Sequence, residues 1–458
     1  MFRIPGRLRG RLRRELLEGG PPTAAFLRPV GPEMPSDAEV VQVVDLCMGV
    51  GEVLLSSGEP AGDTAETMTR LAAACGLPTV DVDITFNSIA MCCHRGMVAA
   101  PVNSMRIVNY RTTDLTRLAS VTDLVEQVTS GRMTTEAATT ALTRATAARH
   151  PYPRWVATVG WGGLAAAVAL LLGGSVLIGL TAFVVTALID RIGRLLNRSG
   201  VPSFFLQVTG GLVATVATVA VFATGVLPPG TQPSLVIAGC VTALLSGLSV
   251  MSATRDAISG YYVTAAGRSA EIALLSAGLL AGVILGLKLG LRFGVTLDPA
   301  EPVGADVAQF GLSTFAAATA AGMFALASYA PLRSLPAAAL TGGMAWAVCG
   351  SLTLFAGSGA VTATGVAAVA VGLATGLTRR WGRVHSQVIV LSGIIPLLPG
   401  LTAYRGFYQL ATQQVVDGLV TITLALAIGL ALAAGVALGD FVARPGARAR
   451  SRARARRT

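Results

Sequence analysis

The stretch Pro396-Leu397-Leu398-Pro399-Gly400-Leu401-Thr402-Ala403-Tyr404-Arg405 decides the fold class, because it interrupts an apolar run that begins near Val388. Two prolines and a glycine would destabilise a helix in water by several kcal/mol. A membrane helix tolerates such a break where the freed carbonyl groups face protein or a water-filled cavity. The stretch therefore predicts a membrane helix that is broken next to a cavity.

A weaker copy of this stretch lies earlier, where Leu244-Leu245-Ser246-Gly247-Leu248-Ser249 matches Leu397-Leu398-Pro399-Gly400-Leu401-Thr402. Arg255 and Asp256 follow the earlier copy closely. A single break is as well explained by a proline kink in a packed helix. Two breaks in matching contexts favour a functional pair, since transporters place discontinuous helices at their substrate sites.

The composition indicates that most of the 458 residues have a membrane as solvent. Hydrophobic residues make up 53% of the chain and charged residues only 13%, against about 25% charged residues in globular domains. The formal charge of +11 is concentrated at the two ends and in short loops, a pattern that sets orientation in a membrane. We therefore expect contact with membrane lipid and no nucleic-acid partner.

Residue types that carry metal or covalent chemistry are few and scattered. The six cysteines form no CxxC or zinc-like spacing, and the three histidines do not cluster, so the sequence predicts no metal site and no cofactor. It contains no nucleophile elbow, HExxH motif or P-loop. We therefore expect that the protein is not an enzyme and has no catalytic residues, and that its soluble part has a structural or gating role.

Changes in composition divide the chain into five parts. Residues 1–35 form a basic amphipathic segment and a linker, which suits binding to anionic lipid and suits a disordered tail equally well. Residues 36–150 are predicted to form a cytoplasmic α/β domain, and residues 443–458 an arginine-rich cytoplasmic tail. The membrane part consists of two halves, residues 151–295 and 303–442.

The α/β domain is predicted from alternating helical and strand-like patterns. Ser36 is typical of a helix N-cap, with acidic residues in the first turn after it. Alternation over 79–86 predicts a half-buried strand that places Asp81 and Asp83 on one face, which we expect to be solvated. The other expected elements are helices over about 36–57, 63–75, 114–130 and 134–148, and strand-like pieces at 89–93, 98–99 and 104–108.

The membrane part is predicted to be all-α and polytopic, with ten spans of about 20 apolar residues each. The first two spans are separate, because one helix over 155–189 would be roughly 52 Å long against a hydrocarbon core of about 30 Å. Gly173-Gly174-Ser175 provides the turn between them. The apolar stretches are 155–172, 175–189, 203–226, 234–251, 270–290, 308–329, 335–355, 358–377, 387–404 and 418–440.

The loops between these stretches predict the orientation of the protein. Alternate loops carry arginines, whereas the intervening loops, such as 227–234, are mostly uncharged. The positive-inside rule therefore predicts a multi-pass protein of the cell's inner (cytoplasmic) membrane with both termini in the cytoplasm. Ten spans divide into five plus five, and homologous halves with an odd number of spans form an inverted repeat.

The order of these features resembles the threonine/serine exporter family over about residues 36–440. The resemblance rests on Leu54-Leu55-Ser56-Ser57-Gly58 followed by Glu66 and Arg70, on Arg255-Asp256, and on residues 396–404. It implies a secondary transporter that exports small hydroxy amino acids, threonine and serine, driven by the proton motive force. The chain departs from a symmetric pattern at Ser246, where a proline would match the second break more closely.

A zwitterionic substrate needs a cationic and an anionic partner, and ionisable residues within a membrane are functional candidates. Half-helix N-termini suit the carboxylate. Asp256 is the first candidate for the acid that holds the ammonium or carries the coupling proton, followed by Asp417, with Glu271 a further candidate. Each of these acids also fits a helix end in water. The predicted substrate and transport residues are Ser246, Gly247, Ser249, Arg255, Asp256, Pro396, Pro399, Gly400, Thr402, Tyr404, Arg405 and Asp417.

Two other functions stay open from the sequence. The resemblance extends to two-chain relatives associated with export of dicarboxylates such as succinate, and Arg255 and Arg405 suit a substrate of that charge. The other alternative is a membrane-anchored enzyme that acts through residues 36–150. The sequence also leaves open the coupling ion and whether the protein forms a homo-oligomer.

The predicted topology is tested by single cysteines at Gln232 and Ser386 in a protein without its native cysteines. A membrane-impermeant thiol reagent should reach the two positions from opposite sides, with Gln232 outside, because five predicted spans separate them. Labelling of both positions from the same side would contradict the ten-span count.

Overall fold

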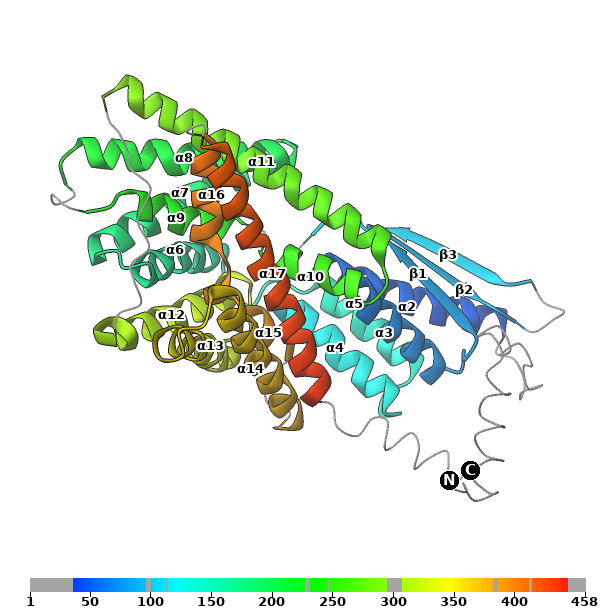
Figure 1. Ribbon diagram of the computed structural model, residues 1–458. Coiled ribbons are helices and arrows are strands. Elements are labelled where there is room, and N and C mark those ends of the chain that lie inside the picture. The colour runs from blue at the N-terminus through cyan, green and yellow to red at the C-terminus, as the bar shows by residue number, and fades with distance from the viewer. Residues whose placement is uncertain are drawn as a thin grey trace, which may run out of the picture.

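The computed structural model describes residues 36–95, 100–111, 114–226, 231–245, 247–294, 307–381, 386–411 and 414–443. Figure 1 shows a small α/β unit joined to a larger bundle of helices. Several sequence-based expectations fall outside the described residues: the basic segment 1–35, the strand-like piece 98–99, Ser246, and the tail from residue 444 onward.

The α/β unit begins with helix α2 (Asp37–Ser56), whose start the sequence predicted correctly. The Ser36 N–H donates to the Glu39 carboxylate at 2.7 Å, and the Glu39 N–H donates to the Ser36 hydroxyl at 3.4 Å. This capping box satisfies two backbone donors that the first helical turn leaves free. The other helices of the unit are α3 (Ala61–Ala74), α4 (Leu115–Thr129) and α5 (Thr135–Ala147).

Three antiparallel strands complete the unit, in the order β1 (Val80–Thr85), β2 (Ser88–Cys93) and β3 (Val102–Ile107). Val80 lies opposite Cys93, which places one row of apolar side chains on the helix-covered face. Asp81 and Asp83 are exposed on the other face, as the alternation predicted. This unit carries a core of its own, although a few buried residues of the helical bundle join it.

The helical bundle contains one helix for each apolar stretch of the sequence except the two that are broken. Helices α6 and α7 are separate, and Gly173 adopts a positive φ of 87° in the turn between them, as the length argument required. The unbroken helices are α6 (Arg154–Leu171), α7 (Val176–Arg198), α8 (Ser203–Ala223), α11 (Tyr262–Arg292), α12 (Phe310–Ala327), α13 (Leu335–Phe355), α14 (Ala360–Trp381) and α17 (Val415–Ala443).

The two remaining apolar stretches are broken, as predicted. The first consists of α9 (Ser234–Leu244) and α10 (Gly247–Ile258), with a bend of 48°. The second consists of α15 (Ser386–Gly393), the 3-10 turn η4 (Ile395–Leu397) and α16 (Gly400–Ala411), with a bend of 45°. Leu398 leaves the helical conformation just before Pro399, because the proline ring restricts the residue that precedes it.

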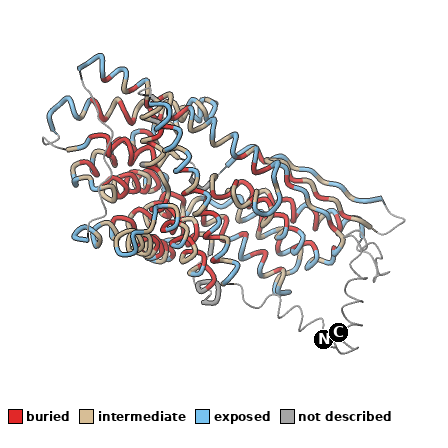
Figure 2. The backbone as a smooth tube through the Cα atoms, in the orientation of Figure 1, coloured by how far each residue is buried: buried red, intermediate tan, exposed pale blue. Residues whose placement is uncertain are grey.

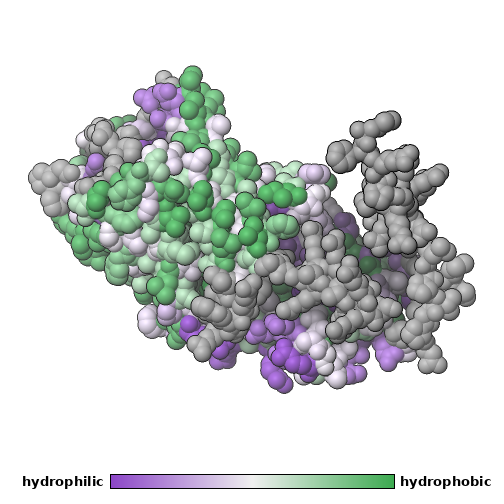
Figure 3. All heavy atoms as spheres, turned by 60° about the horizontal axis from the view of Figure 1, so that its bottom comes forward, coloured by the Kyte–Doolittle hydropathy of each residue, from purple (hydrophilic) through white to green (hydrophobic). Residues whose placement is uncertain are grey.

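The described helices support a polytopic membrane protein. Seven of them are long and apolar enough to span, or up to nine if each bent pair is one span. The remaining expected span, 358–377, corresponds to α14, whose apolar part Ala360–Gly376 is shorter. In Figure 2 buried residues follow the inner faces of the helices, and in Figure 3 hydrophobic residues cover much of the bundle's visible surface.

Helix pairing follows the same order in both halves of the bundle. Helices α6 and α7 pack together, as do α12 and α13; α8 packs along α11, and α14 packs along α17. The last two pairs approach closely because glycines face the partner backbone. A Cβ atom on Gly211 or Gly282 would clash with backbone of the paired helix, and the same holds for Gly372 and Gly439.

Candidate functional site

The two helix breaks meet at the centre of the bundle. Gly400, the first residue of α16, lies directly against the Thr242 side chain of α9. A Cβ atom at position 400 would overlap that side chain, so this approach requires glycine. The break motifs, about 150 residues apart in sequence, therefore lie next to each other in the fold.

A cavity of about 290 Å³ lies beside these breaks. Leu245 and Ser249 line it from the first break, and Ile395 and Leu398 from the second. The turn after α2 in the α/β unit also reaches the cavity. The described lining residues are Ser56, Ser57, Gly58, Arg111, Trp161, Leu164, Thr242, Ala243, Leu244, Leu245, Ser249, Ser252, Arg268, Phe324, Leu391, Ile395 and Leu398.

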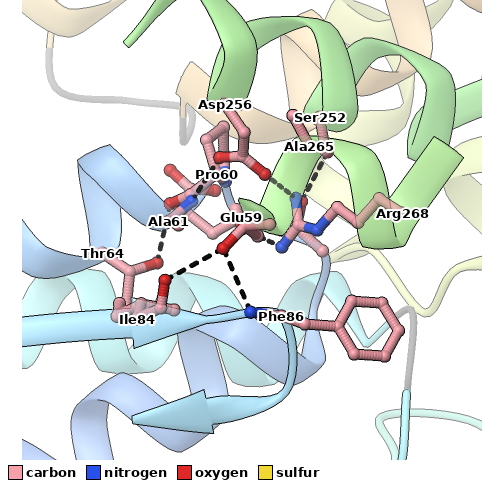
Figure 4. A network of polar contacts seen from close by, with 12 residues as sticks. Glu59, Pro60, Ala61, Thr64, Ile84, Phe86, Ser252, Asp256, Ala265 and Arg268 are labelled. Carbon is pink, nitrogen blue, oxygen red and sulfur yellow. Dashed lines mark hydrogen bonds and ion pairs between the residues drawn. The ribbon is translucent and has the colours of Figure 1, made fainter. Parts of the chain in front are cut away.

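A buried ion pair lies next to this cavity, where α10 and α11 meet the α/β unit (Figure 4). The Asp256 carboxylate lies 2.9 Å from the Arg268 guanidinium, and the two side chains are 0% and 3% exposed. The Ala61 N–H donates to the other Asp256 oxygen at 2.6 Å, and Arg268 donates to the Glu59 carbonyl at 3.0 Å. Both charges thus take their further hydrogen-bond partners from the turn between α2 and α3.

Further polar contacts hold the α/β unit on the same two helices. Arg255 pairs with Asp63 at 2.6 Å, and the Ser252 hydroxyl donates to the Gly58 carbonyl at 2.7 Å. The Thr264 hydroxyl donates to the Ile84 carbonyl at 2.9 Å and accepts from the Phe86 N–H at 3.0 Å. Glu271 pairs with Arg111 at 2.6 Å. Arg255, Asp256 and Glu271, which sequence reasoning singled out, therefore all contact the α/β unit.

Glu59 adds a titratable carboxyl group to this junction. It is partly buried, and its side chain hydrogen-bonds to Gln387 of α15. Burial raises the pKa of Glu59 to about 7, assisted by the neighbouring Asp63 charge and opposed by Arg255, Gln387 and Arg268. A carboxyl group at the junction therefore changes its charge near neutral pH.

The predicted residues of the second break lie around the cavity rather than on its described lining. Pro396 is buried in η4, Pro399 and Thr402 are partly buried, and the Pro399 carbonyl accepts from the Ala403 N–H at 2.8 Å. Tyr404 is 1% exposed and packs into an apolar cluster of α8, α9 and α11; its hydroxyl has no hydrogen-bond partner among the described residues. Arg405 is partly exposed.

Of the remaining predicted residues, Ser249 lines the cavity and Gly247 begins α10. Asp417 lies in the first turn of α17 and is exposed, a position that stabilises the helix N-terminus. It is absent from the described lining of the cavity. The hypothesis that Asp417 reaches the substrate therefore gains no support from its position.

Sequence reasoning did not single out Arg268, Arg111 or Trp161, all of which line the cavity. Arg268 looked like a loop arginine because the apolar stretch begins only at residue 270. The helix starts earlier, at Tyr262, so Arg268 lies in its second turn and is buried. The small residues Ala265, Ala266 and Gly267 directly before Arg268 were the available signal that the helix begins earlier.

Hydroxyl groups give the cavity its polar character. The Ser56 and Ser57 hydroxyls both donate to the Val53 carbonyl, and the Thr242 hydroxyl donates to the Ala238 carbonyl. Each hydroxyl oxygen keeps lone pairs that can accept from a ligand. The lining therefore offers hydrogen-bond acceptors to a small molecule that carries N–H or O–H donors.

A second cavity of about 390 Å³ adjoins the first. Trp161, Ala243 and Leu244 line both cavities, and the second one extends to Asp190 and Arg194 of α7. The two cavities therefore border the same three side chains.

The sequence of this chain matches two models of known protein families. A family model described as "Putative threonine/serine exporter" matches residues 45–290, and a model described as "Threonine/Serine exporter, ThrE" matches residues 313–442. The first match includes most of the α/β unit and the first break, and the second match includes the second break. No solved structure matches the chain.

Two relatives extend over most of the chain. A Mycobacterium tuberculosis (strain ATCC 25618 / H37Rv) protein described as "Probable threonine/serine exporter" is 37% identical over 409 residues, which cover 86% of this chain and 75% of the relative. A Corynebacterium glutamicum protein described as "Threonine/serine exporter" is 34% identical over 426 residues, which cover 92% of this chain and 86% of the relative.

Proposed function

Because this chain belongs to the threonine/serine exporter family, we propose that it exports threonine and serine through the cavity between its two broken spans. The family consists of membrane transporters, so the chain is a transporter and not an enzyme. The observation that carries the proposal is the hydroxyl-rich cavity bordered by both breaks. Its volume of about 290 Å³ is sufficient for a small amino acid.

The proposed topology has ten spans in two inverted halves of five, with both termini in the cytoplasm. The repeated pairing of α6 with α7 and α12 with α13, and of α8 with α11 and α14 with α17, supports this arrangement. A shared site between two related halves is typical of transporters built from inverted repeats. Homo-oligomer formation is compatible with this arrangement and is not required by it.

We propose that Asp256 couples transport to the proton motive force. Its carboxylate is buried beside the cavity-lining Arg268 and is therefore shielded from bulk water. A carboxylate can hold the substrate ammonium or a proton, but not both at once. This mutual exclusion is what exchange of an incoming proton for an outgoing amino acid requires.

Export of a dicarboxylate is the second candidate function. It is favoured by Arg111 and Arg268, since the described lining contains these two cationic side chains and no acidic one. However, Arg111 is paired with Glu271 and Arg268 with Asp256, at 2.6 and 2.9 Å. The positive charge is therefore compensated beside the cavity, which favours a zwitterion over a dianion.

Substrate selectivity tests the proposed function. Proteoliposomes that contain the full chain should move threonine and serine at least roughly tenfold faster than valine, alanine or succinate, because a site that hydrogen-bonds a hydroxyl leaves groups unpaired without it. Ser249→Ala should lower the ratio of the threonine transport rate to the valine transport rate. Ser120→Ala, on the exposed face of α4, should leave this ratio unchanged. Equal rates for valine and threonine, or movement of succinate alone, would refute the proposal.

Proton coupling is tested by Asp256→Asn. This variant should lose efflux driven by a pH gradient and keep counterflow exchange at a raised apparent KM for threonine, because asparagine still accepts hydrogen bonds but takes up no proton and carries no charge for Arg268 or the substrate ammonium. Asp417→Asn and Glu271→Gln, measured in parallel, test the other two carboxyl candidates named from the sequence, and Glu59→Gln tests the junction carboxyl group whose pKa is raised to about 7. Efflux at the wild-type rate in Asp256→Asn under a pH gradient would show that Asp256 is not the coupling acid.

A further inference from the structure

We propose that Arg268 is the residue that binds the substrate carboxylate, and that the turn between α2 and α3 of the α/β unit holds it in position. This inference rests on the proposed function and adds the group that recognises the amino-acid backbone of the substrate.

The position of Arg268 is the first observation. The residue lies in the second turn of α11, its side chain is 3% exposed, and it lines the cavity beside both breaks. A buried arginine is costly unless hydrogen bonds and a counter-charge satisfy it. Asp256 supplies that counter-charge, and the pair places the Arg268 guanidinium beside the cavity, where it can also contact a substrate carboxylate.

The contacts of the guanidinium are the second observation. One terminal nitrogen (Nη1) lies 2.9 Å from the Asp256 carboxylate, and the other (Nη2) donates to the Glu59 carbonyl at 3.0 Å. The Nε atom is buried and has no hydrogen-bond partner among the described residues. Buried polar groups are nearly always paired, so this unpaired donor leaves the cavity-lining guanidinium with capacity for a further acceptor.

The other cavity-lining arginine fits this role less well. The Arg111 side chain is 42% exposed, pairs with Glu271 at 2.6 Å, and lies 5.9 Å from the centre of the Phe86 ring. Solvent screens an exposed charge and weakens its interactions. The Arg268 side chain is far less exposed to solvent than that of Arg111, and a charge-assisted hydrogen bond is stronger in such a buried position.

The arrangement also matches the charge pattern of an amino acid. A zwitterion carries a carboxylate and an ammonium on one carbon, and Arg268 and Asp256 present the two complementary charges 2.9 Å apart. A substrate carboxylate on Arg268 would bring its ammonium toward the Asp256 oxygen. The Glu59 carbonyl and the Ala61 N–H keep the two side chains oriented from the α/β unit.

The proposal is tested by comparing threonine with threoninol, which keeps the hydroxyl and the ammonium but lacks the carboxylate. Each compound competes with labelled threonine for counterflow in proteoliposomes that contain the full chain. Threoninol should compete at least about tenfold less well with the wild type, because it loses charge-assisted hydrogen bonds. Arg268→Gln should raise the apparent KM for threonine at least about tenfold and remove the difference between the two competitors.

Arg255→Gln is the matched comparison. It removes another arginine that contacts the α/β unit, but Arg255 is absent from the described lining of the cavity. Whatever its rate, this variant should keep the wild-type preference for threonine over threoninol. Loss of the preference in both variants would mean that docking of the α/β unit, and not a carboxylate contact, explains the effect, and would overturn the proposal.

If Arg268→Gln does not transport, binding of threonine to the purified variant can still be tested by its effect on the melting temperature. Threonine should raise the melting temperature of the purified wild type and threoninol should not, because only a bound ligand stabilises the fold. A full threonine-induced shift in Arg268→Gln, or an unchanged KM, would overturn the Arg268 assignment alone. A wild type that moves neither threonine nor serine would instead overturn the proposed function.

Discussion

The buried ion pair between Asp256 and Arg268 is the interaction on which the rest of the candidate site depends. Removing one partner of such a pair typically costs about 3–5 kcal/mol, because the remaining charge stays buried and unpaired. Here the further hydrogen-bond partners of both charges come from the turn at Glu59 and Ala61. The membrane helices can therefore hold these charges at the cavity because the α/β unit is docked on them.

The helix breaks explain why a cavity lies beside this ion pair. In the second broken stretch, α15 ends at Gly393 and α16 begins at Gly400 after Pro399, and the absence of a side chain at Gly400 lets α16 approach Thr242 of α9. The first break contributes Leu245 and Ser249 to the same cavity. The α/β unit then adds Ser56 to Gly58, so this unit supplies part of the cavity wall as well as its docking contacts.

Local features of the fold could be predicted from the sequence because their causes are local. The capping box at Ser36, the turn at Gly173, the alternation around Asp81 and both helix breaks depend on residues within one or two turns of each other. Membrane character and family membership likewise follow from composition and motif order.

The site could be predicted only in part, because its contacts join distant parts of the chain. Ala61 and Asp256 are 195 residues apart, and the sequence alone gives no reason to pair them. Arg268 was missed because polar residues precede the apolar part of its helix. Tyr404 belongs to the break motif, yet helical geometry directs it into a cluster with Val219, Ile237 and other apolar side chains.

If threonine occupies the cavity between the breaks, it should protect a cysteine placed at Ser249 from chemical labelling. Ser249→Cys, in a protein whose native cysteines are replaced, is exposed to a membrane-permeant maleimide with and without substrate. Threonine and serine should slow the labelling in proportion to their occupancy, whereas valine at the same concentration should not. Labelling at the same rate with and without threonine, in protein that still transports threonine, would show that threonine does not occupy this cavity.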